Sequence, residues 1–237
     1  MPIYVNNSGT WTQAQEVYVN DSGTWKACND VLVNDSGTWK SALYSAGSQD
    51  YTSAGSYSFT VPAGVYTLTA TVVGGGGGGG GTDGNGDQHA GGSGGSGGKY
   101  VNQSISVTPG QVLSVTVGAG GLPGWCRFNG NFYFGPSGTS GSENGGTGGS
   151  SSFGGYTATG GGGGGGNHGD NGDGYAGSAG SPDGTPGINP DVYGDPRNNF
   201  NCTPGVTNGT GYGSSGRSNG AQGDPESGTS GAVLISW

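Results

Sequence analysis

The sequence predicts a mostly irregular, all-β protein, in which a module of β-hairpin repeats precedes a sandwich of packed polyglycine II helices closed by a few β-strands. Three observations predict it. A fourteen-residue repeat occupies residues 4–40, eight consecutive glycines (74–81) directly follow an apolar strand pattern, and the chain ends on the apolar segment 232–237. We expect two domains, a three-hairpin module at 1–45 and a glycine-rich domain at 46–237.

The hairpin module is predicted from three copies of one unit. Each copy has a β-branched strand, an Asn-Asn/Asp-Ser-Gly turn in which glycine takes the positive-φ position, and a return strand that starts Thr-Trp. A lone two-stranded hairpin is marginal in water, so the three copies need each other or a partner. The tryptophans form either a small shared core or a threefold docking surface. The large aromatic residues of the repeats are Tyr4, Trp11, Tyr18, Trp25 and Trp39.

Residues 57–73 predict two strands separated by a Pro62-Ala63-Gly64 turn. In the second strand, Tyr66, Leu68, Ala70 and Val72 share one face and threonines occupy the other, which is the pattern of a half-buried strand. Later in the chain, residues 105–110 and 113–117 predict a further hairpin.

The glycine-rich region has two opposing interpretations. All but six of the 61 glycines lie from Gly74 onward, and such a chain is either a flexible linker or a set of extended, left-handed helices with three residues per turn. Without a Cβ, such helices can lie side by side and bond their backbones to one another. Strand patterns interrupt the glycines and an apolar segment closes them, which favours a packed scaffold.

Composition excludes several classes of function. Only 29% of the chain is hydrophobic, so main-chain hydrogen bonds must supply much of the cohesion. A net charge of −9 with six basic residues argues against nucleic acid and against anionic membrane surfaces. We expect no membrane insertion, because no stretch approaches the length of a membrane span and Met1-Pro2-Ile3-Tyr4 does not resemble a signal peptide.

No motif indicates an enzyme, a cofactor or a metal site. G-x-G-x-x-G occurs throughout so glycine-rich a chain and carries no information, and the phosphate-binding pattern before Lys99 lacks a required glycine and the hydroxyl residue. Residues 83–87 have the first ligand spacings of a calcium loop without the later glycine and glutamate, and a polar turn is the simpler interpretation. His89 and His168 each closely follow a polyglycine run, so both are expected near one end of the array, and metal ligation by these histidines and nearby aspartates stays open as the weaker alternative. The cysteines have no metal spacing; free thiols are the expectation, and a Cys126–Cys202 pair stays open.

Two insertions in the glycine region contain the candidate recognition residues. Loops on a rigid frame are where binding residues usually lie, and aromatic residues and arginine contribute most binding energy per residue. Alternatively, these aromatic side chains fold inward and stabilise their own loops. The candidates are Trp125, Arg127, Phe128, Phe132, Tyr133 and Phe134 in the first insertion, and Tyr193, Arg197 and Phe200 in the second.

The order of segments resembles the glycine-rich domains of bacteriophage tail-fibre proteins. The resemblance runs from Phe-Thr-Val-Pro-Ala-Gly through polyglycine, Val-Thr-Pro-Gly-Gln and Ser-Ser-Phe-Gly-Gly to the final Gly-Ala-Val-Leu-Ile-Ser-Trp, and covers 57–237. The plan is also similar to the tip adhesins of T-even-type phages. That resemblance implies synthesis in the host cytoplasm and a place at the distal tip of a virion tail fibre. It also implies two partners: a trimeric fibre bound by the N-terminal module, and a bacterial surface receptor, protein or polysaccharide, bound by the loops.

Two other functions compete with a receptor-binding adhesin. One is a structural tail-fibre decoration that contacts no receptor. The other is a glycine-rich ice-binding protein, which needs a flat and regular face; the aromatic and proline-rich insertions argue against it.

Overall fold

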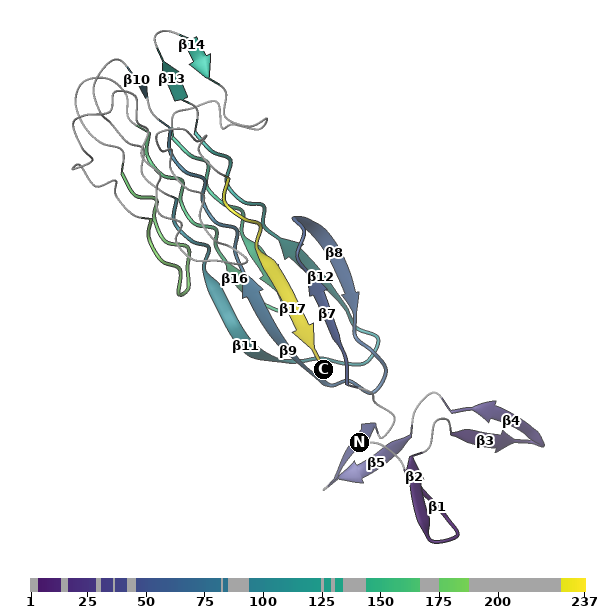
Figure 1. The fold of residues 1–237 in the computed structure, drawn as a ribbon. Helices are drawn as coiled ribbons and strands as arrows, with labels where there is room; N and C mark the ends of the chain where they lie inside the picture. Colours follow the sequence, from purple (N-terminus) through teal and green to yellow (C-terminus); the bar gives the residue numbers. More distant parts are fainter. Residues whose placement is uncertain are drawn as a thin grey trace.

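The computed structural model describes residues 4–13, 17–28, 31–35, 37–41, 46–81, 83–84, 94–124, 126–128, 131–133, 144–166, 175–187 and 227–237 (Figure 1). These residues form short hairpins, a β-sandwich and a long array of extended glycine segments, and no α-helix occurs among them. The predicted all-β fold class is confirmed.

The three sequence repeats fold as three separate hairpins of identical register. They consist of β1 (Tyr4–Asn7) with β2 (Thr10–Gln13), β3 (Tyr18–Asp21) with β4 (Thr24–Ala27), and β5 (Leu32–Asp35) with β6 (Thr38–Ser41). Each is its own two-stranded sheet, and the three point in different directions in Figure 1.

The turn of each hairpin follows from its Ser-Gly pair. Ser22 and Gly23 both have positive φ, at 53° and 90°, which is the type I′ turn that matches the twist of two-residue hairpins. The Oδ1 of Asn20 accepts a 2.9 Å hydrogen bond from the Gly23 N–H, and Asn34 does the same for Gly37. The predicted turn is confirmed.

Two four-stranded antiparallel sheets make the sandwich. One has the order β11 (Lys99–Ser106), β9 (Thr67–Val73), β17 (Ala232–Ser236), β7 (Ser48–Tyr51); the other has the order β16 (Tyr156–Ala158), β15 (Ser151–Phe153), β12 (Val112–Val117), β8 (Gly55–Thr60). Their inner faces share one core, in which Leu68, Val72, Val115, Phe153 and Ile235 are at most 1% exposed.

The hairpin predicted from residues 105–110 and 113–117 is wrong. β11 pairs with β9, whereas β12 pairs with β8 and β15 in the opposite sheet. The connection between them crosses the base of the sandwich, where the Gly110 N–H donates to the Val61 carbonyl and the Val107 N–H donates to the Tyr66 carbonyl. Each strand buries its apolar face better between two sheets than in one open hairpin, and a Pro-Gly turn fits either connection.

The alternation predicted for residues 66–73 is confirmed except at its start. Leu68, Ala70 and Val72 are completely buried. Tyr66 precedes β9 and is 40% exposed, because its backbone belongs to the connection between β8 and β9, where its carbonyl accepts the bond from Val107.

Glycine segment 74–81 continues β9 and lies at the centre of the array. Its successive N–H groups donate in turn to three neighbouring segments, and every third one returns to the same neighbour. This period is that of a helix with three residues per turn, as predicted for polyglycine II. The donor–acceptor pairs are Gly74–Gly98, Gly77–Gly95, Gly75–Gly149, Gly78–Gly146 and Gly76–Thr229, at 2.9–3.0 Å.

The glycine segments alternate in direction. Four run away from the sandwich and four run back, and Figure 1 shows them side by side along the long axis of the body. The outgoing segments are 74–81, 118–124, 159–166 and 184–187, and the returning segments are 94–98, 144–150, 175–180 and 227–231. At their junction with the strands, the buried Ser151 Oγ accepts a 2.9 Å bond from the Gly118 N–H.

Candidate functional site

Toward the end of the glycine array farthest from the sandwich, the chain turns back four times. The returns lie between residues 81 and 94, 124 and 144, 166 and 175, and 187 and 227. Because the glycine segments bond to one another along their length, the first three returns emerge close together although they are far apart in the sequence, and the fourth leaves the array at Gly187, beside Gly177. We call this end the distal end; the hairpins lie beyond the opposite, basal end (Figure 1).

A small sheet joins two of the returns. β10 (Asp83–Gly84) pairs in parallel with β13 (Cys126–Phe128), which pairs in antiparallel with β14 (Asn131–Tyr133). In this sheet Asp83 lies next to Arg127, and Phe132 lies on the other side of Arg127. Nothing in the sequence around Asp83 predicted this strand, because its partner comes from a different return.

The structure describes four of the nine predicted recognition residues by their backbone. Arg127 and Phe128 belong to β13, and Phe132 and Tyr133 belong to β14, so one hairpin brings these four together at the distal end. The other five lie outside the described residues, and their role stays a prediction. They are Trp125, Phe134, Tyr193, Arg197 and Phe200.

The four returns contain most of the charge of the chain. They contain nine of the 15 acidic residues, three of the six basic residues and both histidines. The strong acidity of the protein is therefore concentrated in the residues that connect the glycine segments distally. These acidic residues are Asp83, Asp87, Glu143, Asp170, Asp173, Asp191, Asp195, Asp224 and Glu226.

Two large exposed side chains near the distal end were not predicted from the sequence. Tyr175 is 61% exposed and Leu122 is 44% exposed. The ring of Tyr175 lies against Gly165, where any Cβ would overlap it, and the Gly165 N–H donates to the Tyr175 carbonyl at 2.7 Å. The available signal was a large residue within a run of small ones, because a packed glycine helix has room for such a side chain only on the outside of the array.

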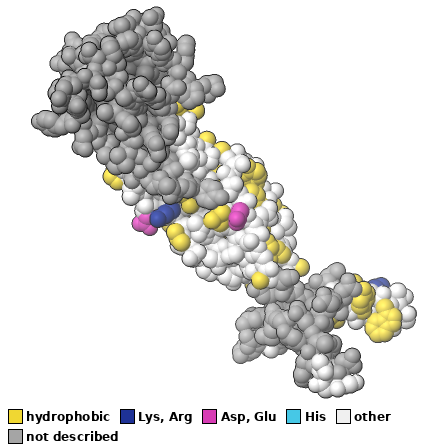
Figure 2. Space-filling view, in the orientation of Figure 1, with side chains coloured by type: hydrophobic (Ala, Val, Ile, Leu, Met, Phe, Trp, Pro, Cys, Tyr) yellow, Lys and Arg dark blue, Asp and Glu magenta, His cyan; other side chains and the backbone are white. Residues whose placement is uncertain are grey.

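The repeats at the basal end present aromatic side chains to solvent. Trp25 is 68% exposed, Trp39 62% and Tyr18 49%, and Figure 2 shows hydrophobic side chains on the outside of the β3–β4 hairpin at its lower right. The hypothesis of a shared tryptophan core is therefore wrong for Trp25 and Trp39. The side chains of Tyr4 and Trp11 lie outside the described residues.

Register places the aromatic residues of each repeat on one face. In the second hairpin, Asn20 lies opposite Trp25 and Tyr18 opposite Ala27, so these four residues share a face. The other face contains Asp21 and Lys26, whose Oδ2 and Nζ atoms are 2.6 Å apart. Trp11 and Trp39 have the equivalent register positions, opposite Asn6 and Asn34. The repeat thus places one tryptophan at the same point of each hairpin.

Within the described part of the chain, no group of three or more His, Cys, Asp or Glu residues is close enough to hold a metal ion. The same residues include no helix that is long and apolar enough to cross a membrane.

Comparison with known proteins agrees with the glycine scaffold. A family model described as "Glycine-rich domain" matches residues 52–237. No curated protein matches the chain. Since the family model covers well over half of the sequence and spans every glycine segment and every strand of the sandwich except β7, the chain belongs to the glycine-rich domain family.

Proposed function

We propose that this protein is the receptor-binding adhesin at the tip of a bacteriophage tail fibre. In this proposal the distal returns bind a host-cell surface molecule, the glycine array holds them rigidly, and the hairpin repeats attach the protein to the end of a trimeric fibre. The protein is made in the host cytoplasm and becomes part of the virion.

The observation that carries the proposal is the convergence of three returns on one end of the array. Segments 74–81, 118–124 and 159–166 run to that end, and segments 94–98, 144–150 and 175–180 run back from it. The fourth return leaves the array part-way along its length, where Gly187 bonds to Gly177, and re-enters it where Gly228 bonds to Gly121. A scaffold of this kind allows long insertions without disturbing the core, because the backbone bonds that hold it are formed below them. Rigid frames that gather variable loops at one end are a common solution for recognition.

The composition of the returns also supports recognition. Besides their aromatic residues and arginines, they are rich in asparagine and glycine, and three tyrosines lie among them. Antibody paratopes use residues of these kinds, since tyrosine provides rigid contact area and the small polar residues provide adaptable hydrogen bonds.

The hairpins at the other end support attachment to a threefold partner. They are three copies of one structure, and Trp25 and Trp39 are largely exposed on them. Tryptophan and tyrosine are favoured anchors of protein interfaces. A chain with three equivalent hairpins can bind one equivalent surface on each subunit of a trimer, although only one copy of the adhesin is present.

An adsorption assay tests the proposal against a purely structural decoration. Purified, fluorescently labelled protein is incubated with cells of the phage host, and its binding to the cells is measured. Phage is then added, and the phage that stays free in solution is counted. The proposal expects labelled protein to bind the cells and to reduce phage adsorption as its concentration rises. A protein that attaches to the fibre but neither binds cells nor competes with the phage is a decoration, and the proposal is then wrong.

A further inference from the structure

The first and last strands of the sandwich form one continuous ladder. β7 lies at the edge of its sheet and has β17 as its neighbour in that sheet. Their pairs run from Tyr51 opposite Val233 to Ser48 opposite Ser236. Gly47 and Trp237 extend the same register by one more pair, and their N–H and carbonyl groups exchange two hydrogen bonds of 3.0 Å each.

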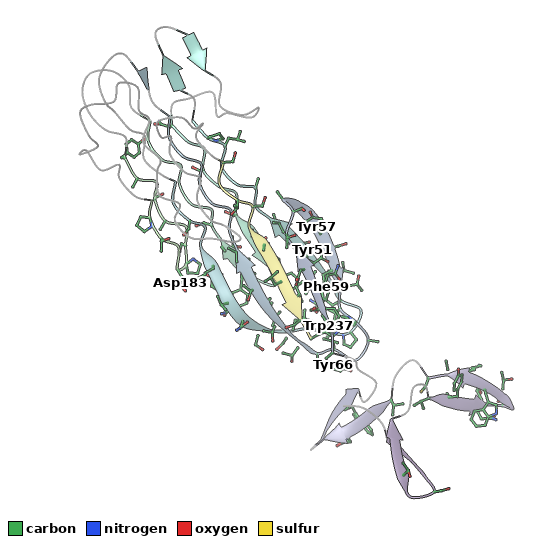
Figure 3. All side chains as sticks on the ribbon, in the orientation of Figure 1. Tyr51, Tyr57, Phe59, Tyr66, Asp183 and Trp237 are labelled. Carbon is green, nitrogen blue, oxygen red and sulfur yellow. The ribbon has the colours of Figure 1, made fainter. Side chains whose placement is uncertain are left out.

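Aromatic rings cover both ends of this ladder. At the basal end, the ring of Trp237 lies over Gly47, and a Cβ built on Gly47 would be 2.6 Å from that ring. The ring centres of Trp237 and Phe59 are 5.5 Å apart (Figure 3). At the other end, Tyr51 is 9% exposed and its ring centre is 5.1 Å from that of Tyr57. Covered hydrogen bonds exchange less readily with water, so the two ends of the ladder are protected against stepwise opening.

The two strands enter the ladder from opposite ends of the molecule. β7 starts at the basal end, immediately after the hairpin repeats, whereas β17 continues glycine segment 227–231, which descends from the distal end. A pull on the repeats and a pull on the last return, between residues 187 and 227, therefore draw these antiparallel neighbours past each other along their own axes. Because ladder hydrogen bonds are perpendicular to the strands, all of them resist such a pull together.

We propose that the β7–β17 ladder is a tensile clamp, which transmits force between the hairpin repeats and the distal returns without unfolding the sandwich. This role rests on the proposed function, since tension along this line arises when one end is held by a virus particle and the other by a cell. The fold directs that tension through a ladder loaded in shear. The same ladder is weak in the other geometry: a pull on residue 46 and on the C-terminus, which both lie at the basal end, opens it one pair at a time.

Single-molecule force spectroscopy on the full-length protein tests the clamp. One handle is attached before residue 1. The second is attached either to the C-terminus or to an azide-bearing residue introduced at Ser227, which is exposed at the start of the descending segment. We expect the force that unfolds the sandwich to be several-fold higher with the handle at 227 than with the handle at the C-terminus. Equal forces in the two geometries, or a lower force at 227, overturn the proposal.

A variant locates the resistance within the ladder. Trp237→Ala removes the ring over Gly47, and we expect it to lower the unfolding force measured from position 227. Tyr175→Ala is the matched control, because it removes an exposed aromatic ring that lies outside the ladder. An unchanged force in folded Trp237→Ala contradicts the contribution of the ring. If that variant does not fold, the comparison of the two geometries in the unmodified chain still decides the proposal.

The force measurement is independent of the adsorption assay. It uses no fibre, receptor or cell, so a protein that fails to bind host cells can still show the difference between the two pulling geometries. Conversely, a protein that binds cells but unfolds at the same force in both geometries retains the proposed function and loses the clamp.

Discussion

Gly77 faces the carbonyl group of Gly162, and a Cβ built on Gly77 would stand 2.5 Å from the Gly162 carbonyl carbon and closer still to its oxygen. These two residues belong to neighbouring segments of the array, one on each polyglycine run. The contact is between two backbones, neither of which has a flexible side chain to move away. The absence of a Cβ at Gly77 is therefore a requirement of the packing.

Gly77→Ala is expected to destabilise the protein by more than about 3 kcal/mol, because overpacking against fixed backbone forces the whole segment to shift. Gly146→Ala is the matched control. A Cβ there meets its nearest neighbour, the Leu122 nitrogen, at 3.0 Å, and a small displacement relieves it. We expect its free energy of unfolding to change by about 1 kcal/mol or less. Denaturant unfolding measures both variants, and equal losses would contradict the close-packed array.

Trp25→Ala and Trp39→Ala are expected to weaken attachment to the fibre while leaving the melting temperature of the body unchanged. Both rings are more than 60% exposed, so their removal costs little folding energy. Copurification with the trimeric fibre measures attachment. Lys26→Ala, which alters the opposite face of the second hairpin, is the control. Full copurification of a chain lacking residues 1–45 would show that the repeats are not the attachment module.

Tyr133→Ala, Tyr193→Ala and Arg197→Ala, made one at a time, are expected to abolish binding to host cells. Each removes a side chain with a large share of interface energy, up to several kcal/mol for a hot spot. Exposed substitutions typically change stability by about 0.5 kcal/mol or less, so the melting temperature should move by only a few degrees. Cell binding and thermal unfolding are measured on the same samples. Early unfolding of every variant would instead indicate that these residues stabilise their own loops.

Alkaline pH is expected to destabilise the β7 end of the sandwich through Tyr51. Burial raises the pKa of the Tyr51 hydroxyl above its ordinary value of 10.0. Below pH 10 the group is neutral in both the folded and the unfolded chain and adds no pH dependence. As the pH rises above 10, the unfolded chain releases its proton first, so the free energy of unfolding falls. Tyr51→Phe removes the group that causes this pH dependence. We therefore expect the free energy of unfolding of the variant, measured by denaturant titration, to fall less steeply above pH 10. Identical pH profiles for parent and variant would contradict it.

The local structure of this protein follows from its sequence because it depends on short-range rules. The Ser-Gly pair fixes the hairpin turn through positive φ, and the fourteen-residue spacing of Trp11, Trp25 and Trp39 fixes three equivalent hairpins. Runs of residues without a Cβ can pack backbone to backbone, so the octaglycine predicted a polyglycine II array. The apolar C-terminal segment likewise predicted a terminal strand received by an ordered body, and β17 lies between β9 and β7 in its sheet.

What only the tertiary structure decided is which segments become neighbours. Residues 107–111 have the same turn chemistry whether they close a hairpin or cross between sheets, and the choice depends on where the apolar faces of β11 and β12 find partners. The pairing of β10 with β13 joins two returns that share no sequence signal. The glycine segments consist mostly of glycine and other small residues, so the strands to which most of them are attached largely set their order in the array. The candidate site also depends on the tertiary structure, because the direction of each segment in the packed array decides at which end the returns lie.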